Sequence, residues 1–480
     1  MGEVSQVLAG TLLASAQEAP QSNQIITIRN GLIERIEAMP PGAAPAGPDI
    51  VDARAHIVMP GLVNAHCHHT ENLQRSARDR LPFELWRVER RGIEDVLRPG
   101  YDELLTVNLA ALVEAAKHGT TSVLHHLSRR DRLHLDEVRA CIDAAKAVGI
   151  RVTVAPSVAD VGWQRIVPRE GPADAMQDLR ALAESMALIE AGPPTVRAMI
   201  GPSSLHGCSD GFLTRCLAMA DHCGVGLHMH CLETRLEATQ RSESGETPIQ
   251  RARRLGILRP EVSLAHVIHV TDDELDDLGQ GGPVLVHNPC SNLKLGSGFA
   301  RVREMRRRGL TVALGSDGGD TSDAYSMFDQ MKMAAVMRRG LEPDYHGWIS
   351  AREALEMATL GGARSLGLRA GRLAPGHLAD LCILRPGIRM WGATDLVQGL
   401  VYSENGASVD TVLVGGEVVL RGGISVRLDE RRLEGDVRGL AARVAAAREV
   451  WSRRRDEGAI ASQVRAAEHE YWNTAGEREG

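Results

Sequence analysis

Five short apolar segments of this chain end in histidine, aspartate or glutamate, the side chains that bind metal ions and move protons. The segment ends are His66-Cys67-His68, His230-Cys231-Leu232-Glu233, His266, His287 and Asp317. In a parallel β/α barrel the C-terminal ends of all strands surround one mouth, where barrel enzymes carry their active sites. Residues as far apart in sequence as His66 and Asp317 are therefore predicted to meet at one site.

The residue types at these segment ends suit a transition-metal centre. His66 and His68 alternate on one predicted strand, so both side chains can turn toward the same point. With His230 and Asp317 they form a mixed nitrogen and oxygen set that suits Zn²⁺ or Fe²⁺ and leaves a position for water. Such an ion lowers the pKa of bound water from ~15.7 to ~7. Any one histidine alone could be a hydrogen-bonded core residue, but their common register favours a metal site.

Two further side chains are candidates for proton transfer. Glu233 follows His230 by three residues, close enough to carry a proton between water, substrate and leaving group. His266 ends the next predicted strand and could hold the water or accept its proton. The alternatives are a solvated loop glutamate and a structural histidine.

The elements that must position these groups alternate along the middle of the chain. Strands are predicted at 62–66, 120–125, 151–155, 195–200, 225–230, 262–266, 283–287 and 311–315, with helical apolar spacing between them. Eight strands that alternate with helices predict an α/β fold, a (β/α)8 TIM barrel over residues 60–367. An open doubly wound sheet is the alternative, which would divide the candidate site between two edges.

Short strands and turns mark both ends of the chain. Residues 1–59 contain Asn30-Gly31 between apolar runs, the pattern of a tight hairpin, and residues 368–426 return to short β segments. One small β-sandwich domain formed from both terminal regions is expected. Residues 427–480 are rich in charge with few large apolar side chains, which predicts a helical C-terminal extension on the surface or at a subunit contact.

The composition limits the partners and the location of the protein. The net charge of −7 gives no reason to expect nucleic acid or an anionic membrane, and the arginine-rich run 301–308 is most simply a solvated helix face. No apolar run approaches the ~18 residues of a membrane span. Eight scattered cysteines and the lack of a secretory signal predict a cytoplasmic protein with reduced thiols. A homodimer or a higher homo-oligomer is the expected assembly.

Five motifs together resemble those of the metal-dependent amidohydrolase superfamily. They are Pro60-Gly61-Leu62-Val63-Asn64-Ala65-His66-Cys67-His68, His228-Met229-His230-Cys231-Leu232-Glu233-Thr234, Leu264-Ala265-His266, His287-Asn288-Pro289-Cys290-Ser291-Asn292 and Leu314-Gly315-Ser316-Asp317-Gly318. Within the superfamily the chain is similar to the aminohydrolase and chlorohydrolase branch of cytosine or guanine deaminase-like and s-triazine hydrolase-like enzymes. The resemblance extends through the segment Gly376–Leu381 near the second β-rich end.

The resemblance implies roles for the same side chains. It implies that His66, His68, His230 and Asp317 bind the metal, that Glu233 shuttles protons, and that His266 and Asp317 act on the water. In two-metal branches of the superfamily a carbamylated lysine near the end of strand four bridges the ions. The predicted fourth strand, 195–200, has no lysine. One divalent metal ion per chain is therefore expected, Zn²⁺ before Fe²⁺.

Several polar residues near the predicted mouth are candidates for substrate binding. Glu71 stands where many relatives have Gln or an apolar residue, and it favours a substrate with N–H donors; the alternative is an ion pair with Arg75 or Arg78. The other candidates are Gln74, His126 (favoured slightly over His125), His206, His287, Asn288 and Asn292. His206 could instead cap a loop, and the asparagines could hold their own turns. His228 alternates with His230 but favours a structural role.

These features predict a mononuclear metal-dependent hydrolase. It would deaminate an amino-substituted nitrogen heterocycle of purine, pyrimidine or s-triazine type through a metal-bound hydroxide and release ammonia. The nearest alternative keeps the scaffold but is a hydrolytic dechlorinase or a hydrolase of urea, carbamate or N-alkylamine bonds. A metal-free scaffold protein is the alternative outside enzymes, and it is disfavoured because every ligand position is filled.

Overall fold

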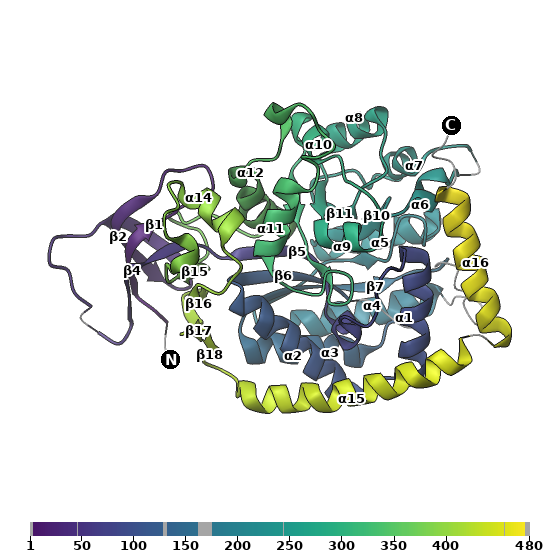
Figure 1. Ribbon diagram of the computed structural model, residues 1–480, viewed down its shortest axis with the longest axis horizontal. Helices are drawn as coiled ribbons and strands as arrows, with labels where there is room; N and C mark the ends of the chain where they lie inside the picture. Colours follow the sequence, from purple (N-terminus) through teal and green to yellow (C-terminus); the bar gives the residue numbers. More distant parts are fainter. Residues whose placement is uncertain are drawn as a thin grey trace.

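The computed structural model describes residues 3–45, 47–127, 132–161, 175–242, 244–455 and 457–475. The other positions lie outside the described residues, among them the first two and the last five of the predicted terminal regions. Figure 1 shows a sheet that combines strands of the N-terminal region with strands from residues 381–425, a central body of strands and helices, and two long C-terminal helices that run along this body.

Parallel strands form the centre of the molecule. They are β5 (Leu62–His68), β6 (Thr120–Leu127), β7 (Arg151–Val158), β8 (Val196–Ala198), β9 (Gly201–Pro202), β10 (Leu227–Cys231), β11 (Val262–His266), β12 (Val284–His287), β13 (Val312–Leu314) and β14 (Asp317–Gly318). One sheet has the order β14-β5-β6-β7-β8, with β9 on β7, and another has the order β10-β11-β12-β13. Isolated parallel bridges from Ile200 to Leu227 and from Ser204 to His230 link the two sheets. The predicted strand positions and the α/β class with parallel sheets are confirmed.

Helices alternate with these strands. They are α1 (Phe83–Leu97), α2 (Tyr101–Lys117), α3 (Leu135–Val148), α4 (Ala175–Glu190), α5 (Asp210–Cys223), α6 (Arg235–Thr239), α7 (Pro248–Arg254), α8 (Asp272–Gly281), α9 (Pro289–Lys294), α10 (Val302–Arg307), α11 (Met327–Val336), α12 (Ala351–Glu356), α13 (Gly362–Ser365) and α14 (Leu396–Gln398). Side chains such as those of Ser209, Thr234 and Thr271 accept a backbone N–H of the first turn and so fix where a helix begins. Thr234 is informative because it starts α6 directly after Glu233.

Both terminal regions contribute to one eight-stranded sheet. Its strands are β1 (Gln6–Leu12), β2 (Gln21–Arg29), β3 (Leu32–Ala38), β4 (Ile50–Pro60), β15 (Leu381–Leu384), β16 (Val409–Val414), β17 (Glu417–Arg421) and β18 (Ile424–Ser425), in the order β18-β17-β16-β15-β4-β1-β2-β3. The antiparallel pair of β4 and β15, with Pro60 opposite Leu381, connects the N-terminal strands to those that follow the central body. Asn30 and Gly31 both have positive φ in the turn between β2 and β3, as the sequence predicts.

Two C-terminal helices, α15 (Glu430–Arg454) and α16 (Gly458–Ala475), pack against α1 (Figure 1). The apolar side chains Leu440, Val444 and Trp451 of α15 share a buried cluster with Trp86 and Ile93 of α1. Gly92 makes room for the Trp451 ring, because a Cβ at this position would lie 2.3 Å from ring atoms. No helix in the described part of the chain is long and apolar enough to cross a membrane.

Candidate metal centre

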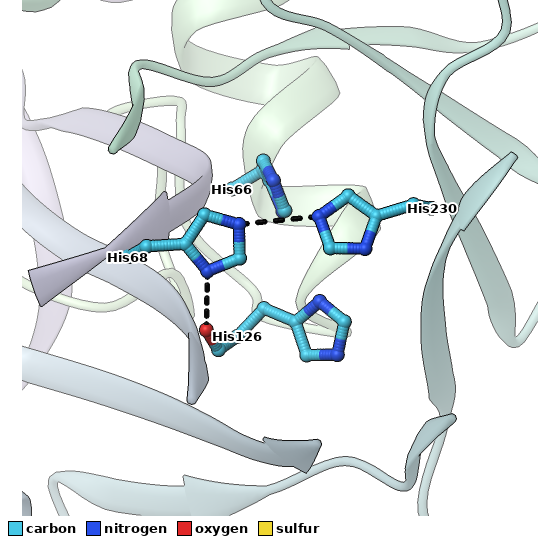
Figure 2. Close-up of side chains that lie close together, drawn as sticks. All are labelled: His66, His68, His126 and His230. Atoms are coloured by element: carbon cyan, nitrogen blue, oxygen red, sulfur yellow. Dashed lines mark hydrogen bonds between the residues drawn. The ribbon is translucent and has the colours of Figure 1, made fainter. Parts of the chain in front are cut away.

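Three imidazoles and one carboxylate converge at the C-terminal ends of β5 and β10 and at the start of β14. His68 Nε2 lies 3.1 Å from His230 Nε2, and Asp317 Oδ1 lies 3.3 Å from both His66 Nε2 and His68 Nε2. Figure 2 shows the rings of His66, His68 and His230 turned toward one another. All four side chains are buried or nearly so. The residues that the sequence assigns to a metal are thus brought together.

The separations between these atoms fit a small divalent ion. Ligand atoms around tetrahedral zinc with bonds of ~2.0–2.1 Å are about 3.3 Å apart, close to the 3.1–3.3 Å observed. His66 Nε2 is buried and has no hydrogen-bond partner among the described residues. The residues present therefore fit a metal ion.

Backbone carbonyl groups fix the orientation of two of the candidate ligands. His68 Nδ1 donates to the carbonyl of His126 at 2.6 Å, and His230 Nδ1 donates to the carbonyl of Ser203 at 2.5 Å. A carbonyl oxygen can only accept, so each Nδ1 carries the proton and each Nε2 presents a lone pair. Two lone pairs that face each other at 3.1 Å repel unless a cation lies between them. Burial and the neighbouring imidazoles lower the pKa of His68 and His230 well below the usual value, which keeps both rings neutral.

At two candidate residues, His266 and Asp317, an unusual backbone conformation directs the side chain toward the site. His266 has φ +77° and Asp317 has φ +63°, a region that non-glycine residues seldom occupy. Such conformations persist where the surroundings enforce them, and they gather at functional sites. If side chains alternated regularly along β11, His266 would share a face with Leu264. The side chain of Leu264 packs in a large hydrophobic cluster on the outer side of the strands. The left-handed backbone instead brings His266 beside Glu233 and Asn292.

The carboxylate of Asp317 is held ionised. Its Oδ2 accepts a hydrogen bond of 2.5 Å from the hydroxyl of Ser291. Burial alone would raise the pKa of Asp317, but the close approach of His66, His266 and His68 holds this pKa well below its usual range. An ionised Asp317 can bind a metal or accept a proton.

Glu233 is the buried acid of the site. Its Oε1 lies 3.8 Å from His266 Nε2, and the other ring nitrogen of His266 donates to Asn292 Oδ1 at 2.8 Å. Burial raises the pKa of Glu233 well above its usual value, and the negative charges of Asp317 and Glu237 raise it further. A protonated Glu233 beside a neutral His266 is suited to general acid catalysis.

Glu237 was not among the residues that the sequence suggested for the site. Its Oε2 accepts the backbone N–H of Glu233 at 3.2 Å and lies 3.7 Å from His206 Nδ1. Burial would raise the pKa of Glu237, but the contact with His206 keeps it below its usual value. His206, a candidate substrate contact, therefore lies against the residue that holds the Glu233 backbone. The sequence signal was the Thr-x-x-Glu spacing from Thr234, a pattern of helix starts.

The structure distinguishes the two histidines at the end of β6. His126 belongs to a group with His66, His68 and His230 whose ligand atoms lie within 4.8 Å of one another, and its Nδ1 has no partner among the described residues. His125 instead stacks on His69 at 4.0 Å between ring centres with 16° between the planes. Cys67, His69 and His125 also lie close together, but stacked rings direct their nitrogen lone pairs in parallel, not at one point. His126 is thus the one at the candidate site.

Glu71 and Gln74 lie behind the site. Glu71 is buried and pairs with Arg90 of α1 at 3.0 Å, a partner that differs from the Arg75 and Arg78 considered from the sequence. Gln74 is buried as well, and its amide donates to the carbonyl of Arg90 at 3.1 Å while its carbonyl accepts from Arg78. Both side chains were predicted to contact substrate, but they interact with the protein itself. The reason is that α1 places Arg90 over the loop that carries them.

The residues after β12 also differ from the expectation of substrate contacts. Asn288 Nδ2 lies 3.4 Å from the ring nitrogens of His266, and Asn292 accepts from the same ring. His287 faces the opposite way and lines a small cavity with Val302 and Arg338. The expectation for His287 is corrected because successive residues of a strand alternate between its faces, and Asn288 takes the inner face.

Comparisons with known proteins agree with this geometry. The model of the amidohydrolase family matches residues 57–419. A 5-methylthioadenosine/S-adenosylhomocysteine deaminase of Desulfitobacterium hafniense is 33% identical over 405 residues, which cover 82% of this chain and 88% of that protein. A 5'-deoxyadenosine deaminase of Methanothermobacter thermautotrophicus is 32% identical over 386 residues, or 80% of this chain and 86% of that protein.

A solved structure has the same fold. The atrazine chlorohydrolase of Arthrobacter aurescens, complexed with zinc, superposes with a TM-score of 0.83 at 25% identity, and the match covers 91% of this chain and 99% of that one. The motifs at the strand ends, the convergent ligand set and the family match lead to one conclusion. This chain belongs to the amidohydrolase family.

Proposed function

We propose that this protein is a mononuclear metal-dependent deaminase of an adenine-type nucleoside. The observation that carries the proposal is the placement of Glu233, a buried carboxyl group with a raised pKa, beside His266 and the cluster of candidate ligands. Deamination of an aminopurine requires an acid that protonates a ring nitrogen and then the leaving amine. The deaminase relatives with adenosine-type substrates support the choice of heterocycle.

The chain's own residues account for the proton transfers. His66, His68, His230 and Asp317 would hold one divalent ion, Zn²⁺ first, which supplies a hydroxide nucleophile at neutral pH. Glu233 would protonate the ring nitrogen next to the amino-bearing carbon and later the departing nitrogen. His266, oriented by Asn292, would hold the water, and the ionised Asp317 would accept its proton. Because these groups are buried, their charges act with little screening by solvent.

The test is an ammonia-release assay on zinc-reconstituted protein. The panel contains 5'-deoxyadenosine, 5-methylthioadenosine, S-adenosylhomocysteine, adenosine, guanine and an aminotriazine, and Glu233→Gln is the control. We expect ammonia from at least one adenine nucleoside and a loss of about 10²–10⁴-fold in kcat in the variant. Full zinc occupancy without ammonia from any member of the panel would refute the deaminase proposal.

A second candidate is hydrolytic dechlorination, which the structural match to the atrazine chlorohydrolase favours. The same machinery could attack a carbon that carries chloride in place of an amine. Chloride release from atrazine, measured on the same zinc-loaded preparation, separates the two activities. Chloride without ammonia would support this second function.

We infer four further properties of the protein. The bridges at Ile200 and Ser204 and the pairing of β14 with β5 support closure of the strands into a (β/α)8 barrel, and the separate core of the terminal sheet supports a small β-sandwich. One ion per chain would be read by elemental analysis of purified protein. A homodimer or larger assembly stays a prediction that sedimentation equilibrium tests directly.

A further inference from the structure

Glu71 lies between helix α1 and the loop that carries Asp317. It belongs to a short 3-10 helix, His69–Gln74, directly after β5. Its Oε1 lies 3.0 Å from Arg90 Nη1, and its Oε2 lies against Gly318, where an added Cβ would be only 1.4 Å from this oxygen. The side chain of Glu71 therefore presses on the residue that follows the candidate ligand Asp317.

Asp320 ends the same loop, and side chains from several neighbouring segments hold it in place. Its Oδ2 accepts a hydrogen bond of 3.0 Å from the indole N–H of Trp86 and lies 3.1 Å from Arg78 Nη1. Lys294 Nζ donates to the Asp320 carbonyl at 3.0 Å. The carboxyl of Asp320 is buried and lies within hydrogen-bonding reach of Glu71.

Two carboxyl oxygens in this region lack partners. Glu71 Oε2 and Asp320 Oδ1 are both buried, and neither has a hydrogen-bond donor among the described residues when both groups are ionised. An ionised carboxylate can only accept, whereas a protonated one also donates. A proton on Glu71 would let this carboxyl group donate to the carboxylate of Asp320.

The balance of charge also favours one proton. Three buried carboxyl groups, those of Glu71, Asp320 and Glu94, are paired with two guanidinium groups, those of Arg78 and Arg90. A surplus negative charge in a buried site is costly. Burial raises the pKa of Glu71 well above its usual value against the opposing effect of Arg90, and the charges of Asp320 and Asp317 raise it further.

We propose that Glu71 is a positioning residue that stays protonated, donates a hydrogen bond to Asp320 and so holds the loop from Asp317 to Asp320 in place for metal binding. It acts through Gly318 and Asp320 and does not contact the substrate. A glutamine has the same shape and donates through its amide, so it can replace a protonated glutamate. An alanine removes both the hydrogen bond and the contact with Gly318.

The experiment compares Glu71→Gln with Glu71→Ala. Zinc affinity is measured by competition with a chromophoric chelator, and kcat and KM are measured on the best substrate of the deaminase panel. We expect Glu71→Gln to retain both zinc affinity and kcat within about twofold. We expect Glu71→Ala to lose about 10–100-fold in zinc affinity, as when outer partners of metal ligands are removed, with KM changed by less than about threefold. Glu246→Gln is the control, a half-buried glutamate that pairs with Arg254, and it should leave zinc affinity and kcat unchanged.

Three results would overturn the proposal. A Glu71→Gln variant as impaired as Glu71→Ala would show that an ionised carboxylate is required. A KM raised at least tenfold with zinc affinity unchanged would show that Glu71 contacts substrate. Unchanged zinc affinity and kcat in Glu71→Ala would show that the residue only fills space. The activity measurement rests on the proposed function, but the measurement of zinc affinity does not. Failure of the proposal for Glu71 can therefore be distinguished from failure of the proposed function.

Two further measurements do not depend on the folding of Glu71→Ala. Gly318→Ala places a methyl group against Glu71 from the other side, and it should also weaken zinc binding at least about tenfold. Infrared difference spectra between the native protein and Glu71→Gln at neutral pH should contain a carbonyl band of a protonated carboxylic acid that comes from the native protein, since the band of Glu233 is common to both and cancels. Native zinc affinity in Gly318→Ala, or absence of this infrared band, would contradict the proposal.

Discussion

His228 Nε2 lies 2.8 Å from His66 Nδ1, beneath the cluster of candidate ligands. On its other side His228 Nδ1 lies 2.6 Å from the hydroxyl of Ser263 on the neighbouring strand β11. For His66 to present Nε2 to a metal, its Nδ1 must donate to His228. Burial and the nearby imidazoles lower the pKa of His228 well below the usual value, which keeps it available as an acceptor. The first histidine of β10 thus orients a candidate ligand on β5.

Removing this support should weaken metal binding. We expect His228→Ala to reduce zinc affinity by about 10–100-fold, because His66 loses the partner that fixes its tautomer and ring plane. The measurement is competition with a chromophoric chelator at constant pH. Ser263→Ala is the control, since it leaves the contact between His66 and His228 intact, and it should have a smaller effect. Equal losses in the two variants would argue against this role for His228.

The buried acid Glu233 should cost stability when no metal is bound. A carboxyl group whose pKa is raised in the folded state contributes stability below its unfolded pKa of ~4.3, and this contribution is lost as pH rises through the folded pKa. Glu233→Gln does not ionise. After chelator treatment the variant should therefore melt at a higher temperature than the native protein at neutral pH. The difference in Tm should shrink toward pH ~4; a constant difference across this range would contradict the assignment.

The negative charge of Glu237 should influence the pKa of the acid Glu233. Because this charge helps to raise the pKa of Glu233, Glu237→Gln should move the alkaline limb of the kcat profile to lower pH. The glutamine oxygen can still accept the backbone N–H of Glu233, so the geometry of the acid is retained. Full pH profiles of both proteins give the measurement, and the control is Glu246→Gln at a half-buried glutamate that pairs with Arg254. An unshifted limb would mean that Glu237 serves only as a structural acceptor.

The packing of α15 on α1 should stabilise the fold. Trp451 is buried against Gly92, and its indole N–H donates to Glu89 Oε2 at 2.7 Å. Trp451→Ala should lower the free energy of unfolding by about 3–5 kcal/mol, as measured by urea denaturation. Trp391, whose side chain is 88% exposed, provides the matched control. Trp391→Ala should change the free energy of unfolding by no more than about 0.5 kcal/mol. A similarly small change in Trp451→Ala would show that α15 is only loosely packed on α1.

The strand positions and the convergence of the candidate ligands could be predicted because they depend on local pattern. An apolar run followed by histidine at alternating positions is visible in the sequence, as in β5 and β10, and parallel strands bring such ends together. The Asn30-Gly31 turn is equally local, since it needs only two residues that tolerate positive φ.

Other features depend on tertiary docking and could not be predicted. The partner of Glu71 is Arg90, which reaches the loop only after α1 packs in place. The inward turn of His266 follows from its left-handed backbone, and no residue type signals it. His287 was expected at the site because it is a histidine at a strand end, but the register of β12 turns it outward.

The pairing of β4 with β15 has a consequence for synthesis of the chain. Strand β4 cannot gain its second neighbour, β15, until residues near Leu381 leave the ribosome, after the central body has been made. Pairing between such distant segments is slow, and an edge that waits for its partner can pair with another chain. Expression that stops before β15 should therefore yield aggregates, and coexpression of the missing C-terminal segment should rescue it poorly.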